Sequence, residues 1–397
     1  MTKARPTLKT EFCDRVGIEY PVILAGMGPV AGTGDPVATG ELCAAVSNAG
    51  GLGMIGGVAY SPDQLREQIR LVRTLTDKPF GVDLLLASTF LWERPKGVDL
   101  ATLAAEADAK DPEERFPEEY REGIAKIAEQ LGIEIERAPR EQSTMGSWVP
   151  EGKSWAGSQI EVLLEEKVPV FASGLGTPGP FAQELKANGT TILSLVGNVR
   201  GARRVAADGA DYVVAQGTEA GGHTGKIGTL ALVPQVMEAV APTPVIAAGG
   251  IANGRALAGV LAMGAEAAWC GTAFLVANEA NQPELQKDRI IEAAAEDTEV
   301  TRLYSGKTMR NITNPFIVAW ENSGLQALPM GEQAALIRDL EHSIRKAGRN
   351  DLLMNAAGQT SGMLTRKRPA GEILAGMVEE AADVLARQNP ARIHVSA

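Results

Sequence analysis

The stretch PVIAAGGIANGRALAGVLAMGAEAAWCGTAF, residues 244–274, decides the fold. It opens with an apolar run that ends at Gly249 and Gly250, and continues with apolar residues at helical spacing. It closes with a second apolar run that leads to Gly271. Short, nearly continuous apolar runs are typical of parallel strands covered on both faces. The stretch is therefore predicted to be a strand–helix–strand unit with glycine-rich turns after both strands.

The same alternation recurs along the whole chain. A chain that alternates strand and helix eight times is predicted to fold as an α/β protein, a (β/α)8 TIM barrel; a doubly wound open sheet is the alternative. The expected strands are residues 22–26, 52–56, 80–86, 168–175, 190–197, 211–217, 244–250 and 267–274. The expected helices are residues 41–49, 62–75, 199–208, 230–240 and 255–263, with a last helix over 370–388 that closes the barrel.

Two segments depart from this repeat. Residues 92–155 follow the third expected strand, are rich in charge and have an amphipathic helix pattern over 120–131. They leave from the strand end where barrel enzymes keep their active sites, so a lid is one interpretation, and a surface elaboration or subunit contact is the other. The predicted organisation is a barrel over 1–297 containing the insertion 92–155, a small helical cap subdomain over 298–360 and a C-terminal segment, 361–397, returning to the barrel.

Composition narrows the class of protein. The net charge of −11 argues against nucleic-acid or anionic-membrane partners, which require a basic surface. Cys13, Cys43 and Cys270 lie far apart and fit neither a disulfide framework nor a zinc spacing, so no metal site and a reducing compartment are expected. Residues 1–10 have no apolar signal core and no run could span a membrane. A cytoplasmic protein is expected, and a homo-oligomer is compatible with the sequence.

The most informative loop is QGTEAGGHTG, residues 216–225, which follows the sixth expected strand. Its four glycines would let the backbone approach a flat ligand closely. His223 lies among them, and imidazole can accept or donate a proton near neutral pH. The alternative is a histidine that only hydrogen-bonds its loop. The other two histidines lie in a polar helical stretch and in the tail, so His223 is the catalytic candidate.

The turns after the seventh and eighth expected strands predict a phosphate site. Loops at these two positions commonly bind phosphate in barrels. Gly249, Gly250 and Gly271 would offer backbone N–H groups, and Thr272 a hydroxyl, beside a helix N-terminus. The alternative is that these glycines are only turn residues.

One further glycine pattern is rejected as a cofactor site. GLGMIG, residues 51–56, spells the dinucleotide fingerprint GxGxxG. It lies within an expected strand instead of opening a helix, and no acidic residue follows at the required distance in a strand. Small strand residues explain it.

At this point the sequence resembles the nitronate monooxygenases, formerly called 2-nitropropane dioxygenases. The matching stretches are PVILAGM at 21–27, AAVSNAGGLGMIGG at 44–57, VAQGTEAGGHTG at 214–225, the 244–274 stretch and SGKTMRNITN at 305–314. The flavin-dependent enoyl-acyl-carrier-protein reductases are similar over the same motifs. The resemblance covers most of the chain outside the insertion and implies an FMN-binding barrel.

The resemblance also implies a site and a reaction. His223 matches the family's catalytic histidine, which removes a proton α to a nitro group or steadies the bound nitronate. The family's reaction is an oxidative denitrification that uses O2 and yields a carbonyl compound and nitrite. The residues that would contact FMN are Gly26, Met27, Asp83, Gln216, Gly217, Gly221, Gly222, Gly249, Gly250, Trp269, Cys270, Gly271 and Thr272.

Several positions depart from the family pattern. Asp83 stands where the family usually has asparagine, and a carboxyl group can donate a hydrogen bond only when protonated. Ala273 replaces a usual arginine, Asn253 a common aspartate, and Trp269 is bulkier than usual. These departures bear on the substrate more than on the cofactor.

Two other functions remain open from the sequence. One is an FMN-dependent NAD(P)H reductase that acts on an enoyl thioester or a quinone. The other is a barrel without flavin, such as a phosphate-binding lyase or isomerase, or a ligand-binding barrel without activity. The expected partners in the leading hypothesis are a small-molecule substrate and O2.

Overall fold

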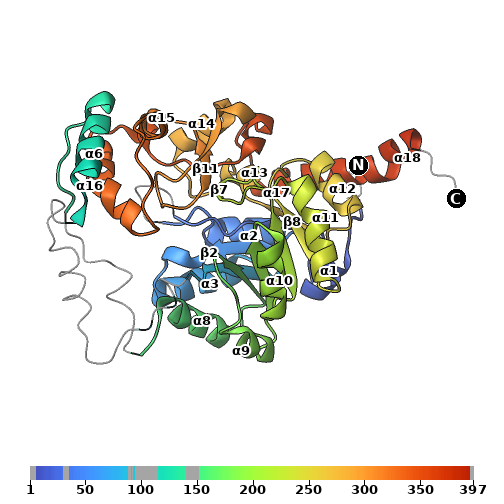
Figure 1. Cartoon of the computed structure of the whole chain (residues 1–397). Helices are drawn as coiled ribbons and strands as arrows, with labels where there is room; N and C mark the ends of the chain where they lie inside the picture. The colour runs from blue at the N-terminus through green and yellow to red at the C-terminus, as the bar shows by residue number, and fades with distance from the viewer. Residues whose placement is uncertain are drawn as a thin grey trace.

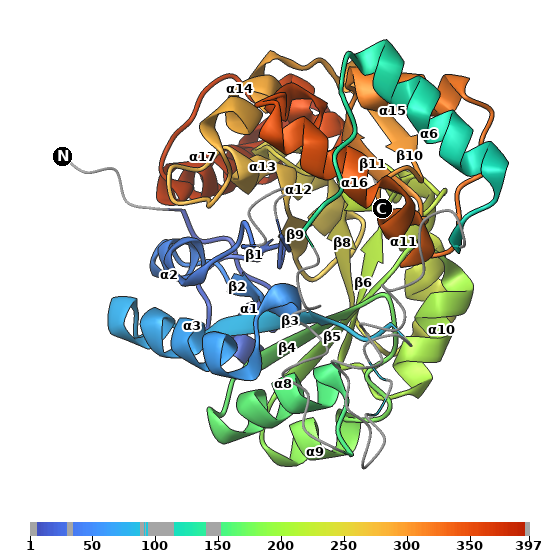
Figure 2. The ribbon, with the colours of Figure 1, turned by 90° about the vertical axis from the view of Figure 1, so that its left-hand side faces the viewer.

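The computed structural model of the chain describes residues 6–29, 35–87, 91, 93, 115–139 and 152–393. Its centre is an eight-stranded parallel sheet in the order β1-β9-β8-β6-β5-β4-β3-β2. The ring closes between β1 and β2, because the N–H of Leu24 donates to the carbonyl of Leu52 at 2.9 Å. The predicted (β/α)8 TIM barrel is confirmed, and the open-sheet alternative is wrong. Figure 2 shows the strands as a ring surrounded by helices.

All eight expected strands form, and each is shorter than predicted. Their bounds are β1 Val22–Leu24, β2 Gly53–Gly56, β3 Phe80–Leu85, β4 Val170–Gly174, β5 Thr191–Val196, β6 Tyr212–Gln216, β8 Val245–Ala248 and β9 Ala268–Cys270. The prediction erred at the end of the last strand, because Thr272 already begins the short helix α13, Thr272–Leu275. The last four residues of the GxGxxG pattern at 51–56 form strand β2, so the pattern does not open a helix, as predicted.

Strand side chains alternate between two apolar layers. The inner layer fills the barrel with residues such as Met54, Ala172 and Trp269. The outer layer packs residues such as Val82 and Phe171 against the surrounding helices. Because both faces of each strand are buried, the strands are apolar throughout instead of alternating with polar residues.

The helices cover the outside of the ring. The five helices predicted after strands one, two, five, six and seven form within a residue of their expected bounds, whereas the helix between the insertion and strand four and the helix after strand four were not predicted. The short helix α9 has too few residues to show a helical period. The covering helices are α2 Gly40–Asn48, α3 Pro62–Leu75, α8 Trp155–Glu165, α9 Ala182–Ala187, α10 Val199–Ala207, α11 Thr229–Val240, α12 Gly254–Ala262 and α17 Ala370–Asp383.

The C-terminal helix returns to the barrel but ends its α-helical part early. Helix α17 packs on α12 and α2 and stops at Asp383, where the predicted helix continued to residue 388. A π-helical turn, Val384–Gln388, and the short helix α18, Asn389–Arg392, follow. Helix α1, Glu11–Val16, lies at the start of the described chain, and its Phe12 packs edge-on against Tyr212 in the inner layer.

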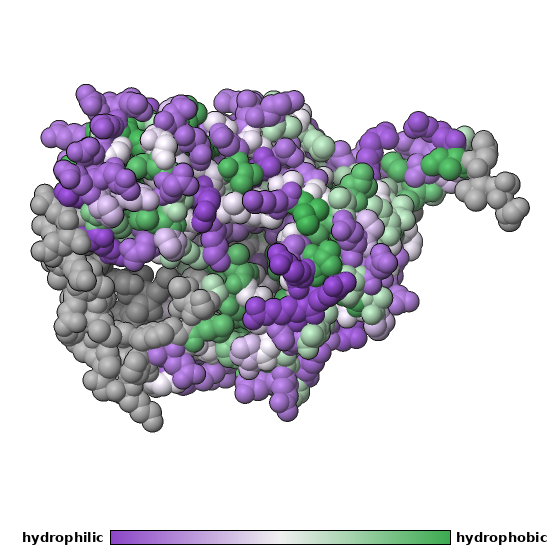
Figure 3. All heavy atoms as spheres, viewed as in Figure 1, coloured by the Kyte–Doolittle hydropathy of each residue, from purple (hydrophilic) through white to green (hydrophobic). Residues whose placement is uncertain are grey.

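A cap stands on one side of the barrel (Figure 1). The segment predicted as helical contains α15 Pro315–Asn322 and α16 Glu332–Lys346, but it begins with two strands, β10 Thr298–Thr301 and β11 Met309–Ile312. Helix α14, Glu284–Glu292, precedes them. The strands were missed because they are four residues long and largely polar. The surface of the cap carries mostly hydrophilic side chains (Figure 3).

The insertion contributes to the same cap. Its helix α6, Glu118–Leu131, buries Ile127 in one apolar cluster with Phe316 of α15 and Leu340 of α16. The Tyr120 hydroxyl donates to the carbonyl of Gln326 at 2.9 Å. Residues 94–114 and 140–151 of the predicted insertion lie outside the described residues, and the lid interpretation stays a prediction.

None of the helices in the described part of the chain combines the length and the apolar composition needed to cross a bilayer.

The glycines of β2 are required by packing, which gives a test of the fold. A Cβ on Gly53 would lie 2.0 Å from the carbonyl oxygen of Cys43 in α2. We expect Gly53→Ala to lower the free energy of unfolding by about 1–3 kcal/mol or more, because backbone must move. Gly259→Ala in α12 is the matched control, since a Cβ there meets nothing within 4 Å. Chemical denaturation measures both, and equal stability of the two variants would contradict the packing.

Candidate active site

The loop that carries His223 is a strand of the cap. Gly222–His223 form β7, which pairs antiparallel with β11, so that Gly222 faces Arg310 and His223 faces Met309. From the barrel side, Nε2 of Gln216 donates to the carbonyl of His223 at 3.0 Å. The backbone of the histidine is therefore held by the cap and by the end of β6 together.

The imidazole has a defined partner and a lowered basicity. Its Nε2 lies 2.9 Å from Oγ of Ser305, and either atom can be the donor, depending on the tautomer. Burial lowers the pKa of His223, and the positive charge of Lys307 lowers it further. No residue in the described ranges hydrogen-bonds Nδ1. A neutral imidazole with one unengaged nitrogen can accept a proton at neutral pH.

Arg310 joins the histidine loop to the cap. Its Nε donates to the carbonyl of Thr218 at 3.0 Å, and its Nη1 donates to Oγ1 of Thr298 at 3.0 Å. The side chain is buried, and burial lowers the pKa of Arg310. Ser305 and Arg310 were missed as functional residues, although their stretch, 305–314, matched the family, because no local pattern places that stretch beside His223.

Several predicted site glycines are explained by contacts between loops. A Cβ on Gly217 would lie 2.0 Å from Oγ1 of Thr229, and one on Gly249 would lie 2.8 Å from the carbonyl oxygen of Gly217. A Cβ on Gly221 would lie 2.6 Å from the backbone of Ala357 in the cap. These glycines are needed for close packing of protein against protein, whatever ligand binds.

The remaining glycines leave room for a ligand. Gly222 and Gly250 have φ of +69° and +75°, which disfavours other residues. Gly271 is required neither by a positive φ nor by close packing. Its φ is −102°, and a Cβ there would meet only Ala25 and the sulfur of Met27, at 3.5 and 3.8 Å. No chain contact in the described structure explains a glycine there, so the space beside Met27 suits a bound molecule.

Three backbone amides directly after the adjacent strands β8 and β9 have no acceptor in the part of the chain that the structure describes. The N–H groups of Gly249, Gly250 and Gly271 donate to no acceptor among the described residues. Amides at the mouths of the adjacent strands β8 and β9 suit an anion such as a phosphate. Oγ1 of Thr272 accepts a hydrogen bond from the N–H of Gly358 at 2.9 Å, so its own hydrogen remains to be donated.

Trp269 and Cys270 could contact a phosphate only through their backbone, because their side chains point elsewhere. The Trp269 side chain points into the inner layer of the barrel, and the Cys270 thiol packs in the outer layer, where burial raises its pKa to about 12. The N-terminus of α11 already has an anionic partner, because the N–H of Thr229 donates to both carboxylate oxygens of Glu219, at 3.0 Å. A phosphate is therefore expected at Gly250 and Gly271 instead of at α11.

On the other side of the mouth, Gly26 and Asp83 are in direct contact. A Cβ on Gly26 would lie 2.1 Å from the Cβ of Asp83. The Met27 carbonyl is fixed nearby, because it accepts from the N–H of Ala38 at 3.2 Å and a Cβ on Gly56 would lie 2.1 Å from it. The backbone at Gly26 and Met27 is thus rigidly placed, as a surface along a flat ring requires.

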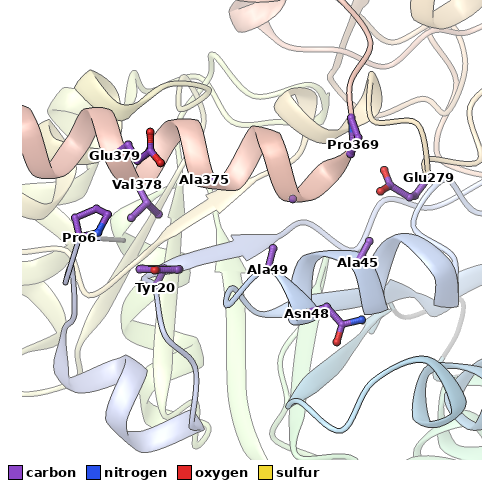
Figure 4. A pocket seen from close by; sticks show the side chains of 11 residues that line it. Pro6, Tyr20, Ala45, Asn48, Ala49, Glu279, Pro369, Ala375, Val378 and Glu379 are labelled. Atoms are coloured by element: carbon purple, nitrogen blue, oxygen red, sulfur yellow. The ribbon is translucent and has the colours of Figure 1, made fainter. Parts of the chain in front are cut away.

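A separate groove of about 340 Å³ lies between α2 and α17 (Figure 4). Tyr20, Ala45, Glu279 and Val378 are among the residues that line it. None of the predicted site residues lines this groove, so it is distinct from the mouth described above.

Fold and site together define an α/β barrel whose mouth presents an imidazole, a rigid glycine surface and backbone amides that have no acceptor among the described residues. The family model for nitronate monooxygenase matches residues 9–380. A relative from Mycobacterium tuberculosis, named as a monooxygenase, is 34% identical over 95% of this chain and 98% of its own length. A Staphylococcus aureus relative, named a probable nitronate monooxygenase, is 31% identical over 94% of this chain and 97% of its own.

Solved structures agree with these relatives. A nitroalkane oxidase from Streptomyces ansochromogenes superposes with a TM-score of 0.73 at 30% identity, covering 95% of this chain and 99% of that one. FabK from Thermotoga maritima superposes with a TM-score of 0.71 at 31% identity, covering 97% and 100%. The chain belongs to the nitronate monooxygenase family. It is therefore an oxidoreductase, and the family implies a flavin; the barrel without flavin does not fit this family.

The charge of Lys307 gives a test of the site's electrostatics. In Lys307→Gln the repulsion of a positive imidazole is removed, so we expect the pKa of His223 to rise while burial still holds it below its ordinary value. Titration of the imidazole by NMR measures this shift. Lys226→Gln is the control, since Lys226 is exposed and does not contribute to the His223 shift. An unchanged His223 titration in Lys307→Gln would show that the two groups do not interact.

Proposed function

We propose that the protein is an FMN-dependent nitronate monooxygenase, which uses O2 to convert alkyl nitronates and nitroalkanes to carbonyl compounds and nitrite. The observation that carries this proposal is the imidazole of His223, held by Ser305 beside a mouth where the amides of Gly250 and Gly271 have no acceptor among the described residues. Family membership and the similarity to a nitroalkane oxidase support the choice of substrate.

The chain's own residues would bind the cofactor in three places. The amides of Gly250 and Gly271 and the hydroxyl of Thr272 would hold one phosphate, which is why FMN is the flavin proposed. Backbone at Gly26 and Met27 would lie along the ring. When bound, FMN supplies the electron-accepting chemistry that no side chain can provide.

His223 would perform the proton transfer. On a neutral nitroalkane, its unengaged nitrogen would remove the proton from the carbon next to the nitro group. Because burial and Lys307 disfavour the imidazolium, the histidine is in its basic form at neutral pH. On a substrate that is already a nitronate, no proton need be removed, and the imidazole would serve to position the anion. Ser305 would fix the orientation of the ring in both cases.

The second candidate is an FMN-dependent NAD(P)H reductase of an enoyl thioester or a quinone. It is favoured by the similarity to FabK, whose structure covers as much of this chain as that of the nitroalkane oxidase. The two candidates are separated by mixing samples of the flavin-loaded protein, without oxygen, with NADH or NADPH in one sample and with a nitronate in another. Bleaching of flavin absorbance by the nitronate alone supports the first candidate. Rapid bleaching by a pyridine nucleotide supports the second.

The cofactor site is tested at Gly271. We expect Gly271→Val to fold like the wild type, because a Cβ there has room, and to bind FMN at least about tenfold more weakly, because the added bulk fills the ligand's space. Flavin fluorescence titration gives the affinity and thermal unfolding without FMN gives the stability. Gly259→Val, on α12 away from the mouth, is the control and should keep FMN affinity. Unchanged FMN binding in Gly271→Val would remove the proposed site.

The role of the histidine is tested with two substrates. We expect His223→Ala to retain FMN and to lose about 10²–10⁴-fold in turnover of neutral nitroalkanes, because the proton acceptor is gone. Turnover of a preformed nitronate should fall much less. Oxygen consumption and nitrite release measure both, and His342→Ala, in α16, is the control. Equal losses with the two substrates would exclude proton removal as the histidine's task.

A further inference from the structure

Asp83 lies inside the barrel at its mouth. It is the fourth residue of β3, and its neighbours Val82 and Leu84 both point outward to the helices. Because strand residues alternate in direction, the Asp83 side chain points into the barrel. Its carboxyl group lies directly against Gly26: Oδ2 and Cγ are 2.7 and 2.8 Å from where a Cβ of Gly26 would be.

No described group neutralises this carboxyl. Its neighbours in the sheet are Gly56 on β2 and Ala172 on β4, and the backbone of Gly26, in the turn after β1, covers it. None of these carries a charge, and the inner layer beneath is apolar. Oδ1 is buried and hydrogen-bonds no partner within the described ranges. The residue is only 9% exposed.

A buried carboxylate without a counter-charge or hydrogen-bond donors is costly, whereas a neutral carboxylic acid is not. Burial accordingly raises the pKa of Asp83 well above its usual range, and no charged group contributes to that shift. A neutral carboxyl group carries a hydrogen and can donate it, as an amide does. The chain thus holds a hydrogen-bond donor aimed at the mouth, next to the backbone of Gly26 and Met27.

We propose that Asp83 acts as a carboxylic acid that donates a hydrogen bond to the flavin ring, so that FMN binding depends on the proton of this one side chain. The proposal rests on the proposed FMN site and adds a property to it. When Asp83 loses its proton, the donor disappears and a negative charge faces the electron-rich edge of the cofactor. FMN affinity should therefore fall as the pH rises through the titration of Asp83, and FMN binding should take up a proton in that range.

Other groups at the mouth titrate outside the range that matters. His223 faces the same space and has a lowered pKa, so it is already neutral above pH 7. The phosphate of FMN has its second pKa near 6 and is fully charged there. Burial holds the hydroxyl of Tyr60, which follows β2, far from ionisation. The part of the pH dependence of FMN affinity above pH 7 that is absent from Asp83→Asn therefore reports on Asp83, because the ionisation of the flavin ring itself is common to both proteins.

The test is FMN affinity against pH, measured by flavin fluorescence from pH 7 upward on wild type and Asp83→Asn. The asparagine amide donates at every pH. We expect wild type to bind FMN at least about tenfold more weakly at the alkaline end, and Asp83→Asn to lose much less affinity over the same range. Asp63→Asn, an exposed change on α3, is the control and should follow wild type.

Proton uptake and the wild-type pH profile decide the outcome even if the variant fails to fold. Calorimetry in buffers of different ionisation enthalpy should detect proton uptake on FMN binding to wild type, and none for Asp83→Asn. A flat wild-type affinity without proton uptake overturns the proposal. Absence of FMN binding at every pH overturns the cofactor site as well, whereas FMN binding without nitronate turnover contradicts only the proposed reaction.

Discussion

The pairing of Gly222–His223 with β11 is the contact on which the rest of the site depends. It makes a barrel loop into a strand of the cap, and the Gln216 hydrogen bond fixes the same backbone from the barrel. Without it, a loop with this many glycines would have great conformational freedom. With it, the imidazole has one position relative to the mouth, and Ser305 and Lys307 reach it from the turn before β11.

The cap is therefore part of the candidate site and not an addition to it. Arg310 connects Thr218 to Thr298, and the segment at Ala357 and Gly358 packs against Gly221 and hydrogen-bonds Thr272. The insertion helix α6 stabilises this arrangement from outside through its apolar cluster with α15 and α16. Buried guanidinium and amide contacts of this kind are costly to break singly.

Sequence reasoning was most successful where one physical rule decided the outcome. The barrel strands are buried on both faces, so their apolar runs could be located, and α3 buries Leu65, Ile69 and Val72, which stand at helical spacing in the sequence. It failed at β10 and β11, whose sequences TEVT and MRNI are stable as strands only because they pair with each other and with β7. Tertiary pairing of that kind leaves no local pattern.

Within the site, the roles of the glycines and of Asp83 likewise depend on tertiary contacts that the sequence does not reveal. Glycine-rich turns predicted a ligand, but Gly217, Gly221 and Gly249 are equally required by neighbouring loops, and only the three-dimensional contacts separate them from Gly271. A charged Asp83 could not donate a hydrogen bond to a flavin, so the sequence alone placed a flavin contact at this position in doubt. Its burial without a counter-charge changes what the side chain can do.

We propose that the amides of Gly250 and Gly271 hold a flavin phosphate while His223 faces the ring. The decisive measurement is a crystal structure of the protein grown with FMN. We expect phosphate oxygens within hydrogen-bonding distance of both amides and the ring between Met27 and the imidazole. FMN bound elsewhere, such as the groove between α2 and α17, or with its ring away from His223, would contradict it.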